Sequence, residues 1–170
     1  MYKIILSLLV LVSVAHVAAA QDEASPWVTF APEAAGFSVS FPGKPVETVD
    51  KKPSFTLHSF SVTMGRATFV ASYTDYEPGK LDPQTALTAN RDKFIKRLQA
   101  TLTSSREITI EGNTGLEFTG ETPAANVKSQ LFLVGNRVFQ LVTFVFRDVD
   151  ETRNVDRFFE SFKFTPAKSG

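Results

Sequence analysis

Histidine and cysteine, the side chains most used for nucleophilic and zinc chemistry, are nearly absent from this chain. The 170 residues include no Cys and only two His, His16 and His58. His16 lies in the leader described below, so a Ser-His-Asp triad would need His58, and no Gly-x-Ser-x-Gly turn accompanies it. A zinc site would need several His or Cys ligands. We therefore predict no catalytic residue, no metal site and no cofactor, and we interpret His58 as a structural residue near a strand irregularity.

Acidic residues gather near the C-terminus, where carboxylates could bind a cation or stabilise a helix. Their spacing lacks the Gly and the closing Glu of a calcium loop. We interpret the first three as groups at a helix N-terminus, where acidic side chains are favourable. A hydrolase that uses two distant carboxylates stays open as an alternative, because such partners need not be adjacent in sequence. The four residues are Asp148, Asp150, Glu151 and Asp156.

The segment YTDYEPGK, residues 73–80, is the best candidate for a recognition surface. Tyr73 and Tyr76 offer large rings with a polar tip, which are common in interfaces, and Asp75 and Glu77 stand beside them. We predict a partner-binding loop made by these four residues. The alternative is structural: Tyr73 completes the buried face of a strand, and Tyr76 covers the edge of a helix.

The first twenty residues have the order of a secretory signal. Lys3 precedes an apolar run at residues 4–14, and Ala18 and Ala20 form an Ala-x-Ala cleavage site. The strongly apolar part is about a dozen residues, short of the roughly 20 that span a bilayer. We expect export to the periplasm or the medium, cleavage near Gln21, and no transmembrane segment afterwards.

Composition limits what the exported part can bind. Cleavage removes only Lys3 among the charged residues and leaves 17 basic and 18 acidic side chains. A nearly neutral chain without charge blocks is not expected to bind nucleic acid. About 150 residues, with all 16 Phe, suit one domain with an aromatic core. We predict an N-terminal arm at residues 21–35, one domain at 36–166 and a flexible tail at 167–170.

The most apolar part of the exported chain, residues 129–146, predicts a β-hairpin that turns at Gly135-Asn136. In its second arm Phe139, Leu141 and Val145 alternate with Val142, Phe144 and Phe146, so both faces are apolar. Such a strand is covered on both sides. Further strands are predicted at residues 37–41, 54–64 with a bulge near His58-Ser59, 66–74, 106–112 and 116–119.

Two helices are available to cover the sheet. Asp82-Pro83 opens an amphipathic helix that we expect to run to about residue 102. Val155, Phe158, Phe159 and Phe162 form the stripe of a short final helix, after which residues 162–164 could form an edge strand. The prediction is an α/β (α+β) fold, a three-layer α/β/α sandwich around a mainly antiparallel sheet of about seven strands.

Short aromatic motifs in this order carry a family resemblance. They are Trp27-x-x-Phe30, then Phe37-x-Val39-x-Phe41-Pro42-Gly43-x-Pro45, and Phe158-Phe159-x-Ser161-Phe162. With the strand and helix order, they make the chain similar to small exported bacterial proteins of the PsbP/Mog1-like superfamily. The resemblance implies an α/β/α sandwich and a role in binding or assembly without catalysis, and it assigns no functional residue here.

The leading hypothesis is therefore an exported, non-catalytic binding or accessory protein of the bacterial envelope, whose partner is a protein or another envelope component. One alternative is a carrier of a small apolar ligand in a Phe-lined pocket, and the carboxylate-dependent hydrolase is the other. The sequence leaves the oligomeric state open.

Overall fold

The computed structural model describes residues 27–83 and 85–166, and within them ten strands and two helices. The predicted signal at residues 1–20 and the predicted tail at 167–170 lie outside the described residues. In chain order the elements are β1 (Val28–Phe30), β2 (Phe37–Phe41), β3 (Val46–Lys52), β4 (Phe55–Met64), β5 (Ala67–Tyr76), α1 (Ala86–Leu98), β6 (Thr101–Ile110), β7 (Asn113–Glu121), β8 (Ala125–Val134), β9 (Arg137–Phe146), α2 (Thr152–Glu160) and β10 (Lys163–Phe164).

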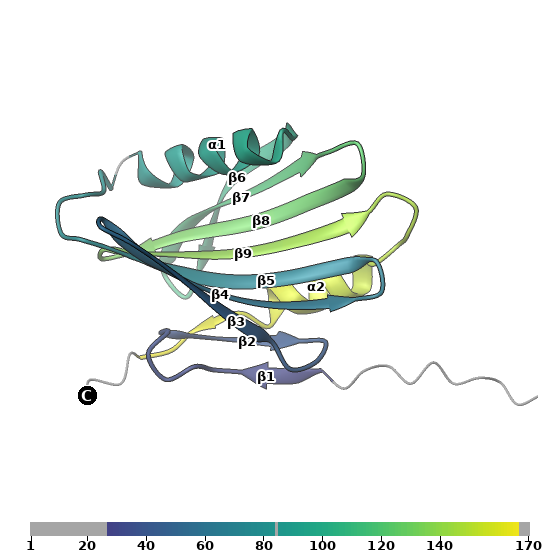
Figure 1. Ribbon diagram of the computed structural model, residues 1–170, viewed down its shortest axis with the longest axis horizontal. Helices are drawn as coiled ribbons and strands as arrows, with labels where there is room; N and C mark the ends of the chain where they lie inside the picture. Colours follow the sequence, from purple (N-terminus) through teal and green to yellow (C-terminus); the bar gives the residue numbers. More distant parts are fainter. Residues whose placement is uncertain (1–26, 84, 167–170) are drawn as a thin grey trace, which may run out of the picture.

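Seven strands form one sheet in the order β3-β4-β5-β9-β8-β7-β6, and every neighbouring pair is antiparallel. Helix α1 lies on one face (Figure 1). Helix α2 lies on the other face, together with a small sheet in the order β1-β2-β10 (Figure 1). The predicted three-layer sandwich around an antiparallel sheet is confirmed, and one of its outer layers combines a helix with three short strands.

The predicted central hairpin is β8 and β9, which turn at Gly135 and Asn136 with a positive φ of 59° at Gly135. Both faces of β9 are covered. Phe139 and Leu141 belong to the aromatic core under α2, while Val138 belongs to a smaller apolar cluster under α1. The hairpin is apolar on both faces because it lies in the middle layer of the sandwich.

The aromatic core on the α2 face holds most of the phenylalanines. The N-terminal arm docks there: Trp27 meets the Phe69 ring edge-on at 5.9 Å, and Phe30 lies 4.8 Å from the Phe60 ring. The fully buried rings are Phe37, Phe41, Phe69, Phe118, Phe132 and Phe158, and all but Phe118 belong to this core.

Strand β4 corrects one prediction. It pairs with β5 without a break from Phe55 to Met64, so no bulge interrupts it near His58-Ser59. The apolar residues change phase because they serve two faces. Phe60 and Val62 enter the core on the α2 face, and Leu57 points to the α1 face.

The end of the first helix is also corrected. Helix α1 stops at Leu98 because Gln99 takes the left-handed conformation, with φ 51°, and its N–H bonds to the carbonyls of Ile95 and Lys96. Leu102, predicted as helical, is instead an exposed residue of β6. At the other end Asp82 forms a turn before the helix and accepts a hydrogen bond from the Thr85 hydroxyl at 2.8 Å.

Candidate functional site

The structure separates the four residues predicted as a partner-binding loop. Strand β5 continues to Tyr76, and its alternation places Tyr73 and Asp75 on the α2 face and Tyr76 on the α1 face. Glu77 follows the strand and is exposed, and its backbone N–H donates to the Ser54 carbonyl at 3.3 Å. The four side chains thus do not share one surface, and partner binding by this segment stays a prediction.

Tyr73 and Asp75 belong to an interaction that fixes the N-terminal segment. Arg137 donates to the Asp75 carboxylate through Nη2 at 2.8 Å and through Nε, and its guanidinium lies 4.4 Å from the centre of the Tyr73 ring. Arg137 Nη1 also donates to the carbonyls of Ala34 and Ala35 at 2.7 and 2.9 Å. Tyr73 is buried, and this burial raises the pKa of its hydroxyl.

His58, the one histidine in the described part of the chain, makes two contacts. Its ring stacks on Tyr73, with centroids 4.6 Å apart, and its Nδ1 lies 3.1 Å from Glu47 Oε1. These contacts hold the ring against strands β3 and β5 and are structural in kind.

The acidic residues near the C-terminus take separate roles. Asp150 accepts a hydrogen bond from the Thr152 backbone N–H at 3.0 Å, and this bond lowers the pKa of Asp150. It stabilises the start of α2 as expected for the N-terminus of a helix. Asp148 pairs with Arg66 at 3.0 Å, and Asp156 lies 4.0 Å from Lys128. Within residues 27–83 and 85–166, no group of three or more His, Cys, Asp or Glu is arranged to hold a metal ion.

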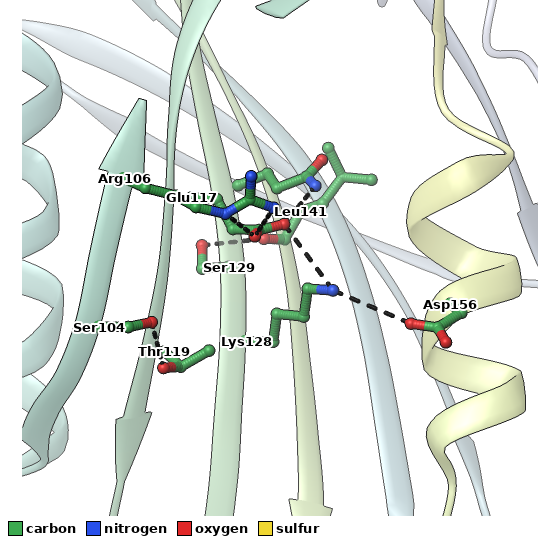
Figure 2. A network of polar contacts seen from close by, with 9 residues as sticks. Ser104, Arg106, Glu117, Thr119, Lys128, Ser129, Leu141 and Asp156 are labelled. Carbon is green, nitrogen blue, oxygen red and sulfur yellow. Dashed lines mark hydrogen bonds and ion pairs between the residues drawn. The ribbon is translucent and has the colours of Figure 1, made fainter. Parts of the chain in front are cut away.

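A polar cluster centred on Glu117 lies beside α2 (Figure 2). Glu117 is almost fully buried, and it accepts hydrogen bonds from Gln130 Nε2 at 2.8 Å and Arg106 Nε at 2.9 Å. Lys128 lies between the carboxylates of Glu117 and Asp156, at 3.8 and 4.0 Å. Burial raises the pKa of Glu117. The hydrogen bonds from Gln130 and Arg106 and the positive charges of Lys128 and Arg106 lower it by a larger amount, so the pKa of Glu117 is lowered overall. The carboxylate is ionised and its charge is neutralised inside the cluster.

A cleft on the opposite face of the sheet is different, because its charges are not neutralised. Helix α1 packs on Phe118, Leu131 and Val138 of β7, β8 and β9. On this face of the sheet, strands β3, β4 and β5 lie beyond the part that helix α1 covers (Figure 1). The space between, which we name the α1 cleft, has a volume of about 540 Å³. Its lining is Asp50, Lys52, Ser54, Phe55, Leu57, Thr74, Tyr76, Lys80, Asn90, Lys93, Phe94, Arg97 and Gln140.

The floor of the α1 cleft is apolar and firmly held. Phe55, Leu57 and Phe94 are half-buried there. The Phe94 ring also packs edge-on against Phe118 at 5.9 Å. Tyr76 joins them, with its ring 5.7 Å from Phe55 and its hydroxyl donating to Asn90 Oδ1 at 3.4 Å. Burial raises the pKa of Tyr76, so its hydroxyl stays protonated and can donate at neutral pH.

The rim of the α1 cleft is cationic. Lys52, Lys80, Lys93 and Arg97 are exposed on it, against one carboxylate, Asp50, which pairs with Lys52 at 3.0 Å. Among the described residues, the side chains of Lys80, Lys93 and Arg97 form no ion pair or hydrogen bond. The cleft therefore has three uncompensated positive charges above an apolar floor.

Of the residues predicted from sequence, only Tyr76 lines this cleft. Helical spacing shows which side of α1 is buried but not where the helix lies on the sheet, so it does not place Lys93 and Arg97 beside a cleft. The signal that could have located the cleft is the phase change in β4, which places Phe55 and Leu57 on the face opposite Phe60.

Comparison with known proteins gives a fold and no closer relationship. No family model and no curated protein matches the chain. Among solved structures, it is similar to the solution structure of cyanobacterial PsbP (CyanoP) from Synechocystis sp. PCC 6803, with a TM-score of 0.61 and 11% identity. The match covers 82% of this chain and 93% of that one. The resemblance to a PsbP-like fold is confirmed. Neither helix in the described part of the chain is long and apolar enough to cross a membrane.

Proposed function

We propose that this chain is an exported, non-catalytic binding or accessory protein of the bacterial envelope, and that the α1 cleft is its binding site. The observation that carries the proposal is the unneutralised rim of Lys80, Lys93 and Arg97 above the apolar floor. Unpaired charge beside half-buried apolar side chains is typical of surfaces that bind another molecule.

The other polar clusters support binding over catalysis, because their groups are engaged in structural contacts. Glu117 is surrounded by donors, and Arg137 joins Asp75 to the N-terminal segment. His58 contacts Glu47 and Tyr73. Among the acidic residues near the C-terminus, Asp148 pairs with Arg66, Asp156 lies 4.0 Å from Lys128, and Asp150 stabilises the start of α2. The PsbP-like fold is consistent with a binding role.

The carrier alternative is favoured by one observation, the volume of the α1 cleft. About 540 Å³ lies within the usual range for small-molecule sites, roughly 300–1,000 Å³. The phenylalanines as a group do not form that site, because most of them fill the core on the α2 face and only Phe55 and Phe94 line the cleft.

Capture from the envelope of the source organism tests the proposal. The exported chain would be immobilised, and bound proteins and small molecules would be identified by mass spectrometry. Three forms are compared: the natural chain, the double variant Lys93→Glu with Arg97→Glu, and Lys96→Glu. Lys96 is an exposed cation of the same helix that does not line the cleft, so its variant reverses one charge on α1 outside the cleft, where the double variant reverses two charges at the rim.

We expect a component that the natural chain and Lys96→Glu retain and that the double variant loses. Capture of the same components by all three forms would contradict the assignment of the α1 cleft. Turnover of a captured component by the natural chain would contradict the non-catalytic role.

A further inference from the structure

The α1 cleft has the chemistry of a site for one class of small molecule. We propose that it binds an amphiphile with an apolar chain and a single anionic head group, a carboxylate or a phosphate. The inference rests on the proposed function and names the ligand class of the same site. Three features of the cleft carry it: its floor, its rim and the state of the backbone beneath it.

The floor suits an apolar chain. Phe55 and Leu57 project from β4, and Phe94 projects from α1 to meet them across the cleft. These side chains are half-buried, so a bound chain would remove their remaining apolar surface from water, which is favourable in proportion to the area covered. The contact of Phe94 with Phe118 holds this part of the floor in place before any ligand arrives.

The rim suits one anionic head group. Lys93 and Arg97 are four residues apart on α1, so they stand one above the other on the same side of the helix. Lys80 approaches from the segment between β5 and α1. An Arg guanidinium binds carboxylate or phosphate oxygens in pairs, and a Lys ammonium adds a point charge. A head group here would meet cations that have no partner of their own among the described residues.

The backbone of β4 and β5, beneath the floor, cannot take an extended peptide as an added strand. One way to hold an extended peptide is to add it as a strand to a free sheet edge, and on this side of the sheet that edge is β3, not β4 or β5. Strands β4 and β5 pair with each other, and each pairs with another neighbour, β3 and β9 respectively. Their main-chain groups are therefore already bonded within the sheet. A ligand on this floor is held by side chains alone, which favours an apolar chain with one charged end.

Isothermal titration calorimetry tests the inference with dodecanoate and dodecyl phosphate below their micelle concentrations and with dodecanol below its solubility limit. The two anions differ in head group and share one chain, and dodecanol has that chain without charge. We expect one anion to bind per chain and to bind more tightly than dodecanol. We expect Lys93→Gln with Arg97→Gln to weaken anion binding by about three- to tenfold, as for two partly screened charge contacts, with little effect on dodecanol.

Two further variants control for the helix and the floor. Lys96→Gln removes a cation of α1 outside the cleft and should bind the anions like the natural chain. Leu57→Trp fills the floor and should weaken binding of all three probes. Preferential binding of one anion identifies the head group. Failure of both anions to bind, or equal binding by the natural chain and the double variant, would overturn the inference. If the anions fail while envelope capture still depends on Lys93 and Arg97, the ligand class is wrong and the proposed function stands.

Discussion

Replacement of Glu117 is the most informative test of how the polar cluster beside α2 contributes to stability. Glu117→Ala removes the acceptor of the hydrogen bond that the Gln130 side-chain amide donates. Gln130 is only 7% exposed, so water cannot readily replace that acceptor. Leaving a buried donor without a partner costs about 1–3 kcal/mol. Arg106 is 69% exposed and can turn to water, so loss of its ion pair adds about 0–1 kcal/mol. Together these contributions predict that the free energy of unfolding falls by about 1–4 kcal/mol.

The comparison with Glu117→Gln isolates the charge, because the amide keeps an acceptor oxygen while removing the carboxylate. The folded-state pKa of Glu117 is lowered from its ordinary value of 4.5. Its ionisation therefore contributes stability that is fully present above that value and is lost as the pH falls through the folded-state pKa. The difference in unfolding free energy between the natural chain and Glu117→Gln should be constant near neutral pH and shrink in acid.

Urea denaturation at a series of pH values measures both effects, with circular dichroism as the probe. A Glu117→Ala variant within about 0.5 kcal/mol of the natural chain would refute the reasoning, because surface substitutions typically change stability by no more than that. So would a Glu117→Gln difference that grows in acid, since it would mean that the buried carboxyl is neutral rather than ionised.

Three further substitutions are predicted from packing and hydrogen bonds. Gly115→Ala should cost about 1–3 kcal/mol in urea denaturation, because its Cβ would collide with the Phe132 ring and come within 2.5 Å of a backbone carbonyl. Arg137→Met should cost about 1–3 kcal/mol and release the N-terminal segment to limited proteolysis, since Asp75 and two backbone carbonyls lose their donor. Phe144→Ala should cost about 1–3 kcal/mol, less than the roughly 3–5 kcal/mol of Phe132→Ala, because the Phe144 ring is only half-buried.

Matched substitutions show what would contradict these expectations. Gly120→Ala meets chiefly the end of the Ile95 side chain, at 2.8 Å, which can move. An equal or larger cost there than for Gly115→Ala would show that the sheet is not packed as described. Arg147→Met breaks an exposed pair with Glu121 and an exposed hydrogen bond to the Thr122 carbonyl, and because both groups can turn to water it should cost no more than about 1 kcal/mol. Equal protease sensitivity in the Arg137 and Arg147 variants would count against the role given to Arg137.

Much of the fold could be predicted because its strongest patterns are local. The alternation through β9 indicated a strand covered on both faces, and the spacing of Val155, Phe158 and Phe159 indicated α2. Strand β3 was not predicted, because its sequence, VETVDKK, is largely polar and every residue is exposed. An edge strand of this kind is positioned by the backbone of β4 rather than by apolar burial.

The candidate site was largely missed for a physical reason. The α1 cleft depends on how far the helix extends across the sheet, and that is decided by tertiary packing on Phe118 and Leu131. The helical periodicity of apolar residues identifies the buried side of a helix. It does not distinguish a cation in open solvent from one at the rim of a cleft. Lys93 and Arg97 can be recognised as rim residues only from the structure, which places Phe55 and Leu57 in the same cleft.

The central claim, that the α1 cleft is the binding site, is tested most directly by mapping a ligand on the protein with ¹H–¹⁵N and methyl NMR during a dodecanoate titration. The account predicts saturable shifts at Leu57, Thr74, Phe94 and Arg97, which are lost in the Lys93→Gln, Arg97→Gln double variant and kept in Lys96→Gln. Shifts confined to the α2 face, or the same shifts in the double variant, would contradict it.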